Sequence, residues 1–126
     1  MFNTLLVMIG GAIGCAMRYQ LGRLATRLMG PGFPWGTLAA NMLGGIAMGL
    51  LAGWLALRAQ QGGEPIRLFA AVGILGGFTT FSSFSLETML MIERGEWASA
   101  LGYVLVSVIL AIGGLAVGLA TMRSFA

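Results

Sequence analysis

The sequence predicts an all-α membrane protein with four transmembrane helices, the third of them broken. Hydrophobic residues make up 58% of the 126-residue chain, charged residues only 9%, and the mean hydropathy is +0.92. Soluble domains carry roughly 25% charged residues, so this composition excludes a soluble fold. The chain is too short for a membrane bundle plus a soluble domain, and we expect residues 1–126 to form a single transmembrane domain.

Four uncharged stretches can each supply one membrane crossing: residues 1–17, 28–57, 68–86 and 97–122. A spanning helix needs about 20 apolar residues. The first helix must therefore continue beyond Arg18, and the second stretch must include a loop. Proline and glycine place connections at residues 31–34 and 60–65, and residues 93–96 form the last turn.

The third stretch contains a polar, glycine-interrupted segment, Gly-Gly-Phe-Thr-Thr-Phe-Ser-Ser-Phe-Ser-Leu-Glu, at residues 76–87. This segment should break a membrane helix. Each unpaired backbone N–H or C=O in hydrocarbon costs several kcal/mol, so a broken helix survives only where protein buries it or where it lines a cavity. We therefore expect the functional site here.

Arginine placement gives weak guidance on orientation. One predicted membrane face carries Arg58, Arg67 and Arg123, and the other carries Arg18, Arg23, Arg27 and Arg94. An excess of arginine on one face normally sets the direction in which a membrane protein inserts. The near-even count here favours insertion in both orientations and an antiparallel homodimer, in which two identical chains form the counterpart of an inverted repeat. A single orientation set by other factors remains the alternative. Glycine pairs four residues apart, such as Gly10 with Gly14 and Gly114 with Gly118, predict close helix packing.

The absent residue types exclude much chemistry. The chain has no histidine, aspartate or lysine and one cysteine, so imidazole bases, Schiff bases, zinc clusters and internal disulfides are not available. We therefore expect no enzyme. The arginines are scattered near segment ends, which argues against binding of nucleic acid and suits anchoring in membrane lipid.

The polar groups inside the predicted spans are mainly neutral donors. Hydroxyls, an amide and aromatic ring edges can surround a small anion, because a ring edge carries the positive part of the quadrupole. Weak binding of this kind suits conduction. Ordinary packing of the phenylalanines and a simple Tyr-Ser link between helices remain alternatives. The residues are Asn41, Phe81, Phe84, Glu87, Tyr103 and Ser107.

Three motifs together resemble the Fluc/CrcB family of fluoride channels over essentially the whole chain. They are Gly-Gly-x-x-Gly-x-x-x-Arg at residues 10–18, Gly-Thr-Leu-Ala-Ala-Asn at 36–41, and the segment 76–87. The resemblance implies an antiparallel, dual-topology homodimer with four helices per subunit and two fluoride pores. It also implies a structural sodium ion at the dimer centre, held by the backbone carbonyls of Gly76 and Thr79 from both subunits.

The resemblance also implies roles for side chains. Phe81 and Phe84 would line the pore, Asn41 would coordinate fluoride, and Tyr103 and Ser107 would continue a polar path. Further expected roles are pore hydroxyls at Thr80, Ser82 and Ser83, positive vestibule potential from Arg18, and a structural or gating carboxylate at Glu87. For Arg18, a snorkelling anchor at a helix end is the alternative. Some family members carry another hydroxyl one turn beyond the serine, where this chain has Ala111, so the outer pore is expected to differ.

The function implied is passive export of fluoride across the cell inner membrane by a multi-pass channel, which lowers fluoride toxicity. Two other classes of protein are alternatives. A four-helix multidrug antiporter needs a membrane-embedded acid on its first helix, and this chain has none there. A non-transporting scaffold leaves the combination of Asn41, Phe81 and Phe84 unexplained.

Overall fold

The computed structural model describes residues 1–58 and 62–125, and the regular secondary structure of these ranges is all helical. The elements are α1 (Phe2–Met29), α2 (Trp35–Leu57), α3 (Glu64–Ile66), η1 (Arg67–Leu75), α4 (Gly76–Phe78), α5 (Ser82–Glu93) and α6 (Trp97–Arg123). Within the described residues, four helical segments are long and apolar enough to cross a membrane: Phe2–Met29, Trp35–Leu57, Glu64–Glu93 and Trp97–Arg123. The predicted all-helical class and the number of spans are confirmed.

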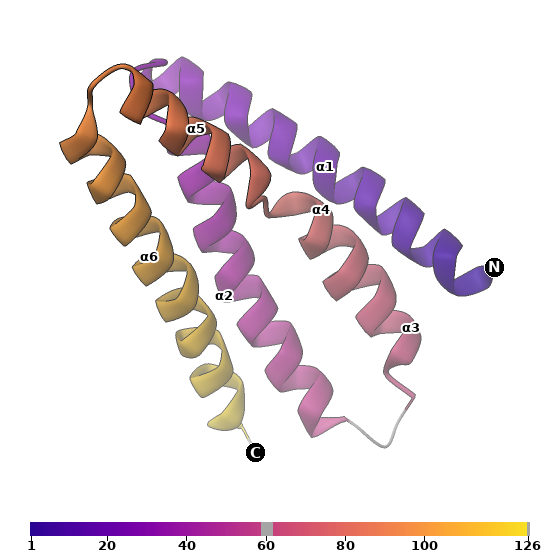
Figure 1. Cartoon of the computed structure of the whole chain (residues 1–126). Helices are drawn as coiled ribbons and strands as arrows, with labels where there is room; N and C mark the ends of the chain where they lie inside the picture. Colours follow the sequence, from indigo (N-terminus) through magenta and orange to yellow (C-terminus); the bar gives the residue numbers. More distant parts are fainter. Residues whose placement is uncertain (59–61, 126) are drawn as a thin grey trace.

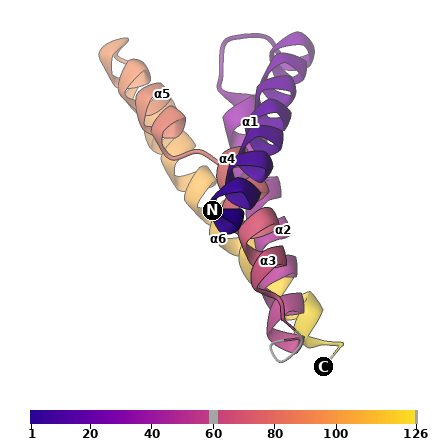
Figure 2. The ribbon, with the colours of Figure 1, turned by 90° about the vertical axis from the view of Figure 1, so that its right-hand side faces the viewer.

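The four segments run alternately in opposite directions (Figure 1). Helices α2 and α6 pack along each other, and α1 packs on η1 and α4. Figure 2 shows that α5 leans away from α1 and lies on α6. The two helical parts of the third segment therefore pack against different helices, η1 and α4 on α1 and α5 on α6. The junction between α4 and α5 therefore lies where these two packing units meet.

The predicted connections agree with the structure in most places. The Pro-rich segment precedes α2, which begins at Trp35, and the last turn joins α5 to α6 with Gly95 at a φ of 79°. In that turn Arg94 Nε donates to Glu96 Oε2 at 2.8 Å, and this bond lowers the pKa of the Glu96 carboxyl below its ordinary value. The first helix continues past Arg18 to Met29, as its length required.

The predicted end of the connection before the third span was wrong by two residues. Glu64 and Pro65 were expected in the linker before the third span, but they begin α3, because proline is tolerated in the first turn of a helix, where its missing N–H has no partner. Gln60 and Gln61 lie outside the described residues.

Small residues set how closely the helices approach, as the glycine spacing predicted. A Cβ at Gly14 would collide with the backbone of η1 at Ile74 and would come within 2.9 Å of the Phe78 amide nitrogen. A Cβ at Gly118 on α6 would come within 2.6 Å of the Ile46 carbonyl oxygen on α2. Backbone therefore packs directly on backbone at both contacts, a geometry that small residues permit in membrane helices.

The third segment is irregular over much of its length. Residues Arg67–Leu75 are π-helical, α4 ends at Phe78, and α5 begins at Ser82. Between α4 and α5, Thr79 has extended backbone angles of −84° and 159°. The π-helix keeps its backbone groups paired through i→i+5 bonds, but the extended residue ends that pattern, so the backbone groups around Thr79 need partners from elsewhere.

Candidate functional site

The side chain of Asn41 binds both backbone groups of Thr80. Asn41 Nδ2 donates to the Thr80 carbonyl oxygen at 2.9 Å, and Asn41 Oδ1 accepts from the Thr80 N–H at 2.8 Å. Asn41 comes from the middle of α2, whereas Thr80 lies between α4 and α5. One side-chain amide from a neighbouring helix thus supplies both hydrogen-bond partners of the Thr80 backbone, within the interruption between α4 and α5 (residues 79–81).

Two backbone donors near the interruption are diverted from their helical acceptors. In a continuous α-helix the Thr80 N–H would bond to the Gly76 carbonyl and the Ser83 N–H to the Thr79 carbonyl. Here Thr80 donates to Asn41, and Ser83 donates to Thr80 Oγ1 at 3.1 Å. The carbonyl oxygens of Gly76 and Thr79 therefore lack their helical donors and are free to accept other partners.

The hydroxyl cluster at the start of α5 has a structural role in this geometry. Thr80 Oγ1 accepts the Ser83 N–H and lies 3.3 Å from Ser82 Oγ, so it satisfies one of the unpaired amides at the N-terminus of α5. Ser82 is exposed and Ser83 half-buried. The structure brings all three predicted residues together around Thr80 Oγ1, which accepts from Ser83 and shares a hydrogen bond with Ser82.

Arg18 reaches the same interruption from α1. Its Nε donates to the Gly77 carbonyl oxygen at 3.2 Å, so its guanidinium lies at the C-terminal end of α4, where a positive charge complements the helix dipole. It also lines a hollow of about 580 Å³ together with Thr37. α1 continues to Met29, so Arg18 does not stand at a helix end, and its Nε is bound to a protein carbonyl.

Glu87 joins three helices. Thr37 Oγ1 on α2 donates to Glu87 Oε2 at 3.1 Å, and the Tyr103 hydroxyl on α6 donates to Glu87 Oε1 at 3.2 Å. Thr37 was not among the predicted site residues. Its signal was available in the sequence, because it lies four residues before Asn41 and so on the same face of the second helix.

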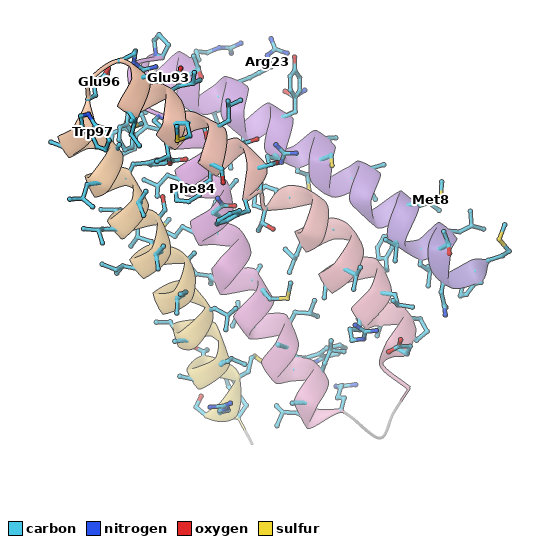
Figure 3. The ribbon with its side chains drawn as sticks, viewed as in Figure 1. Met8, Arg23, Phe84, Glu93, Glu96 and Trp97 are labelled. Carbon is cyan, nitrogen blue, oxygen red and sulfur yellow. The ribbon has the colours of Figure 1, made fainter. Side chains whose placement is uncertain are left out.

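The two predicted pore phenylalanines differ sharply in exposure. Phe84 is 9% exposed and packs its ring 5.1 Å from that of Tyr103, near the middle of the molecule in Figure 3. Phe81 is 78% exposed, although its ring centre is only 5.6 Å from that of Phe84. Phe81 precedes α5 as its N-cap residue, whereas Phe84 lies within that helix.

A second hollow, of about 400 Å³, adjoins the interruption. Asn41, Thr80, Phe81, Phe84, Ser107 and Ala111 are among the residues that line it. Ser107 Oγ is buried and, within residues 1–58 and 62–125, has no hydrogen-bond partner. Buried hydroxyls nearly always have a partner, so an unpaired one on the wall of a hollow indicates a place for a ligand or water. Ala111 extends this wall without a hydroxyl.

These features define a small, polytopic, all-helical membrane protein with neutral donors gathered around an interrupted segment. A family model described as CrcB-like protein, Camphor Resistance (CrcB), matches residues 5–119. The chain belongs to the CrcB family, which confirms the resemblance drawn from its motifs.

Several curated relatives are similar over nearly their whole length. A protein of Novosphingobium aromaticivorans named fluoride-specific ion channel FluC is 52% identical over 128 residues, which cover 100% of both chains. Proteins with the same name from Phenylobacterium zucineum and Caulobacter vibrioides (strain NA1000) are 56% and 51% identical. The alignment with the Phenylobacterium protein covers 94% of each chain. The alignment with the Caulobacter protein covers 98% of this chain and 97% of the relative.

Proposed function

We propose that this chain is a fluoride-selective ion channel and not an enzyme, and that one domain formed by residues 1–126 carries the activity. The observation that carries the proposal is the buried hydroxyl of Ser107, which has no hydrogen-bond partner among the described residues and lies in a hollow shared with Asn41 and Phe84. A hydroxyl without a protein acceptor can donate to an anion. The names of the curated relatives support fluoride as that anion.

The proposed fluoride path joins the two hollows. The hollow lined by Arg18 and Thr37 would collect anions, because a positive guanidinium raises their local concentration. From Thr37 the path would continue past Tyr103 toward Ser107, with Glu87 accepting the hydrogen bonds of the Thr37 and Tyr103 hydroxyls and so positioning them rather than contacting the anion. Along such a path, neutral donors and ring edges replace water around the ion without trapping it. Passive flow through this path needs no energy-coupling step.

We propose that the working unit is an antiparallel, dual-topology homodimer with two pores. In the single chain, the Phe81 ring is 78% exposed and the hollow beside it is open on one side. A second, inverted copy would cover the ring and close the hollow. The near-even arginine count supports insertion in both orientations. In this proposal the interrupted third segment is a broken membrane helix, whose exposed backbone is buried by the partner or lines the pore.

The freed carbonyls of Gly76 and Thr79 fit the structural sodium ion that the family resemblance implied. Carbonyl oxygens at the end of a half-helix carry partial negative charge and coordinate sodium in other membrane proteins. Diversion of the Thr80 and Ser83 amides leaves these two oxygens without their helical donors. Gly76 is also exposed in the single chain, so a second copy could approach it. We propose that these carbonyls from two chains hold one sodium ion, which supplies positive charge between them.

Removal of sodium should therefore weaken the dimer and reduce fluoride flux several-fold. Two antiparallel chains would then face each other through unpaired carbonyls that repel one another. The measurement is the dimer fraction and fluoride efflux of protein purified with N-methylglucamine in place of sodium, and then with sodium restored. Unchanged dimer fraction and flux after exhaustive sodium removal would contradict the sodium site.

We place the channel in the inner membrane of the cell, where it would let fluoride leave the cytoplasm and so confer fluoride resistance. A negative interior drives an anion outward with about 2.3 kcal/mol per charge per 100 mV. The direct test is efflux from liposomes that contain the purified protein, with fluoride and chloride compared. We expect fast, electrogenic fluoride efflux and negligible chloride efflux. Correctly folded protein that releases no fluoride would exclude this function.

A further inference from the structure

The C-terminal part of α1 carries two arginines, Arg23 and Arg27, in addition to the Arg18 that the proposed fluoride path uses at the same hollow. Three of the seven basic residues of the chain, Arg18, Arg23 and Arg27, line the hollow of about 580 Å³. Its other lining residues are Tyr19, Gly22, Thr26, Gly36 and Thr37. No carboxylate is among them, so the hollow combines positive charge with three neutral hydroxyl groups.

Among the described residues, no acidic side chain forms a salt bridge with an arginine of this hollow. Within the part of the chain that the structure describes, the salt bridges join Arg67 to Glu64 and Arg94 to Glu96, both away from the hollow. The guanidinium carbon of Arg23 lies 6.0 Å from the centre of the Tyr19 ring, a contact that orients the group and leaves its charge in place. Figure 3 shows Arg23 projecting outward from α1.

The size and position of the hollow favour a polyatomic anion at the membrane surface. Helix α1 has 28 residues, which at about 1.5 Å each extend roughly 42 Å, whereas the hydrocarbon core is about 30 Å thick. The first 17 residues carry no charged side chain, so we infer that they span the hydrocarbon and that the end with Arg23 and Arg27 reaches the headgroup layer. This is the depth at which lipid phosphates lie.

Arginine is suited to phosphate for a geometric reason. Its planar guanidinium presents donors in a fork that matches two oxygens of a phosphate, whereas a lysine ammonium acts as a point charge. Basic pockets between membrane helices bind anionic lipid headgroups. We propose that the hollow lined by Arg23 and Arg27 binds a phosphate group, supplied by an anionic phospholipid or by free phosphate. Such binding does not require fluoride conduction.

The test compares two double variants in the full-length protein in an uncharged detergent. Arg23→Gln/Arg27→Gln removes two charges from the hollow, and the matched control Arg58→Gln/Arg123→Gln removes two charges elsewhere. Arg23 and Arg27 are exposed, so the change removes little packing. One arm titrates inorganic phosphate and follows its ³¹P NMR line width. The other measures retention of dioleoylphosphatidylglycerol by native mass spectrometry, with phosphatidylcholine as the reference lipid.

We expect the hollow variant, and not the control, to weaken binding about tenfold in at least one arm. Loss in the phosphate titration identifies a site for free phosphate, and loss of phosphatidylglycerol alone identifies a lipid site. Arg23→Lys/Arg27→Lys should recover binding only in part, because charge returns without the fork. Equal behaviour of both Gln variants, or no binding of either probe to the unsubstituted protein, would overturn the site. Fluoride efflux measured separately shows whether the channel function fails on its own.

Discussion

Replacement of Phe81 or Phe84 by isoleucine should reduce fluoride efflux by about a hundredfold, which corresponds to about 2.7 kcal/mol of added barrier. Isoleucine keeps an apolar side chain but removes the ring edge that would face the anion. Both rings line the hollow that also contains the unpaired Ser107 hydroxyl. The measurement is initial fluoride efflux from liposomes that contain equal amounts of dimer.

The difference in exposure of the two rings separates conduction from packing. Phe84 is buried against Tyr103, so its replacement also removes core contacts, whereas Phe81 is 78% exposed and contributes little to the packing of the single chain. Phe69→Ile on η1 serves as the control, because that ring is not among the residues that line the hollow. Normal flux in folded Phe81→Ile and Phe84→Ile proteins would contradict the role of these rings.

Asn41→Leu should both destabilise the fold and abolish flux. The change keeps a similar volume but leaves the Thr80 N–H and C=O without the two bonds that Asn41 supplies. Each orphaned buried group costs about 1–3 kcal/mol, so the free energy of unfolding should fall by about 2–6 kcal/mol, toward the lower end because these groups are half-buried. The measurement is unfolding in mixed micelles, followed by circular dichroism.

Asn3→Leu is the matched control, since Asn3 is the only other asparagine of the chain and lies exposed near the start of α1. It should leave stability and flux unchanged. A different result for Asn41→Leu is also informative. If α4 and α5 joined into one continuous helix, the Thr80 N–H would return to the Gly76 carbonyl, and stability would not fall. That result would show that Asn41 maintains the interruption without adding to stability, and it would contradict the predicted fall in the free energy of unfolding.

The position of the candidate site could be predicted from local sequence, but its internal connections could not. Glycines and hydroxyl residues in an uncharged span pointed to residues 76–87. Tyr103 and Ser107 were recognised as polar groups inside a span, and the structure shows that both are buried on α6. The carboxylate of Glu87 was recognised, but its bond to Thr37 spans 50 positions in the chain. The sequence periodicity of one helix does not indicate which of its side chains contact those of another helix.

The sequence by itself determined the class of the protein, because hydropathy and chain length leave only apolar helices of membrane-spanning length. It also indicated where helices approach closely, since glycines four residues apart leave one face of a helix without bulky side chains. Only the tertiary structure decided that Asn41 binds Thr80, that the carbonyls of Gly76 and Thr79 lose their donors, and that Phe81 is exposed while Phe84 is buried. The physical reason is that hydrophobic patterning acts within one helix, whereas hydrogen-bond partners and burial depend on how separate helices pack.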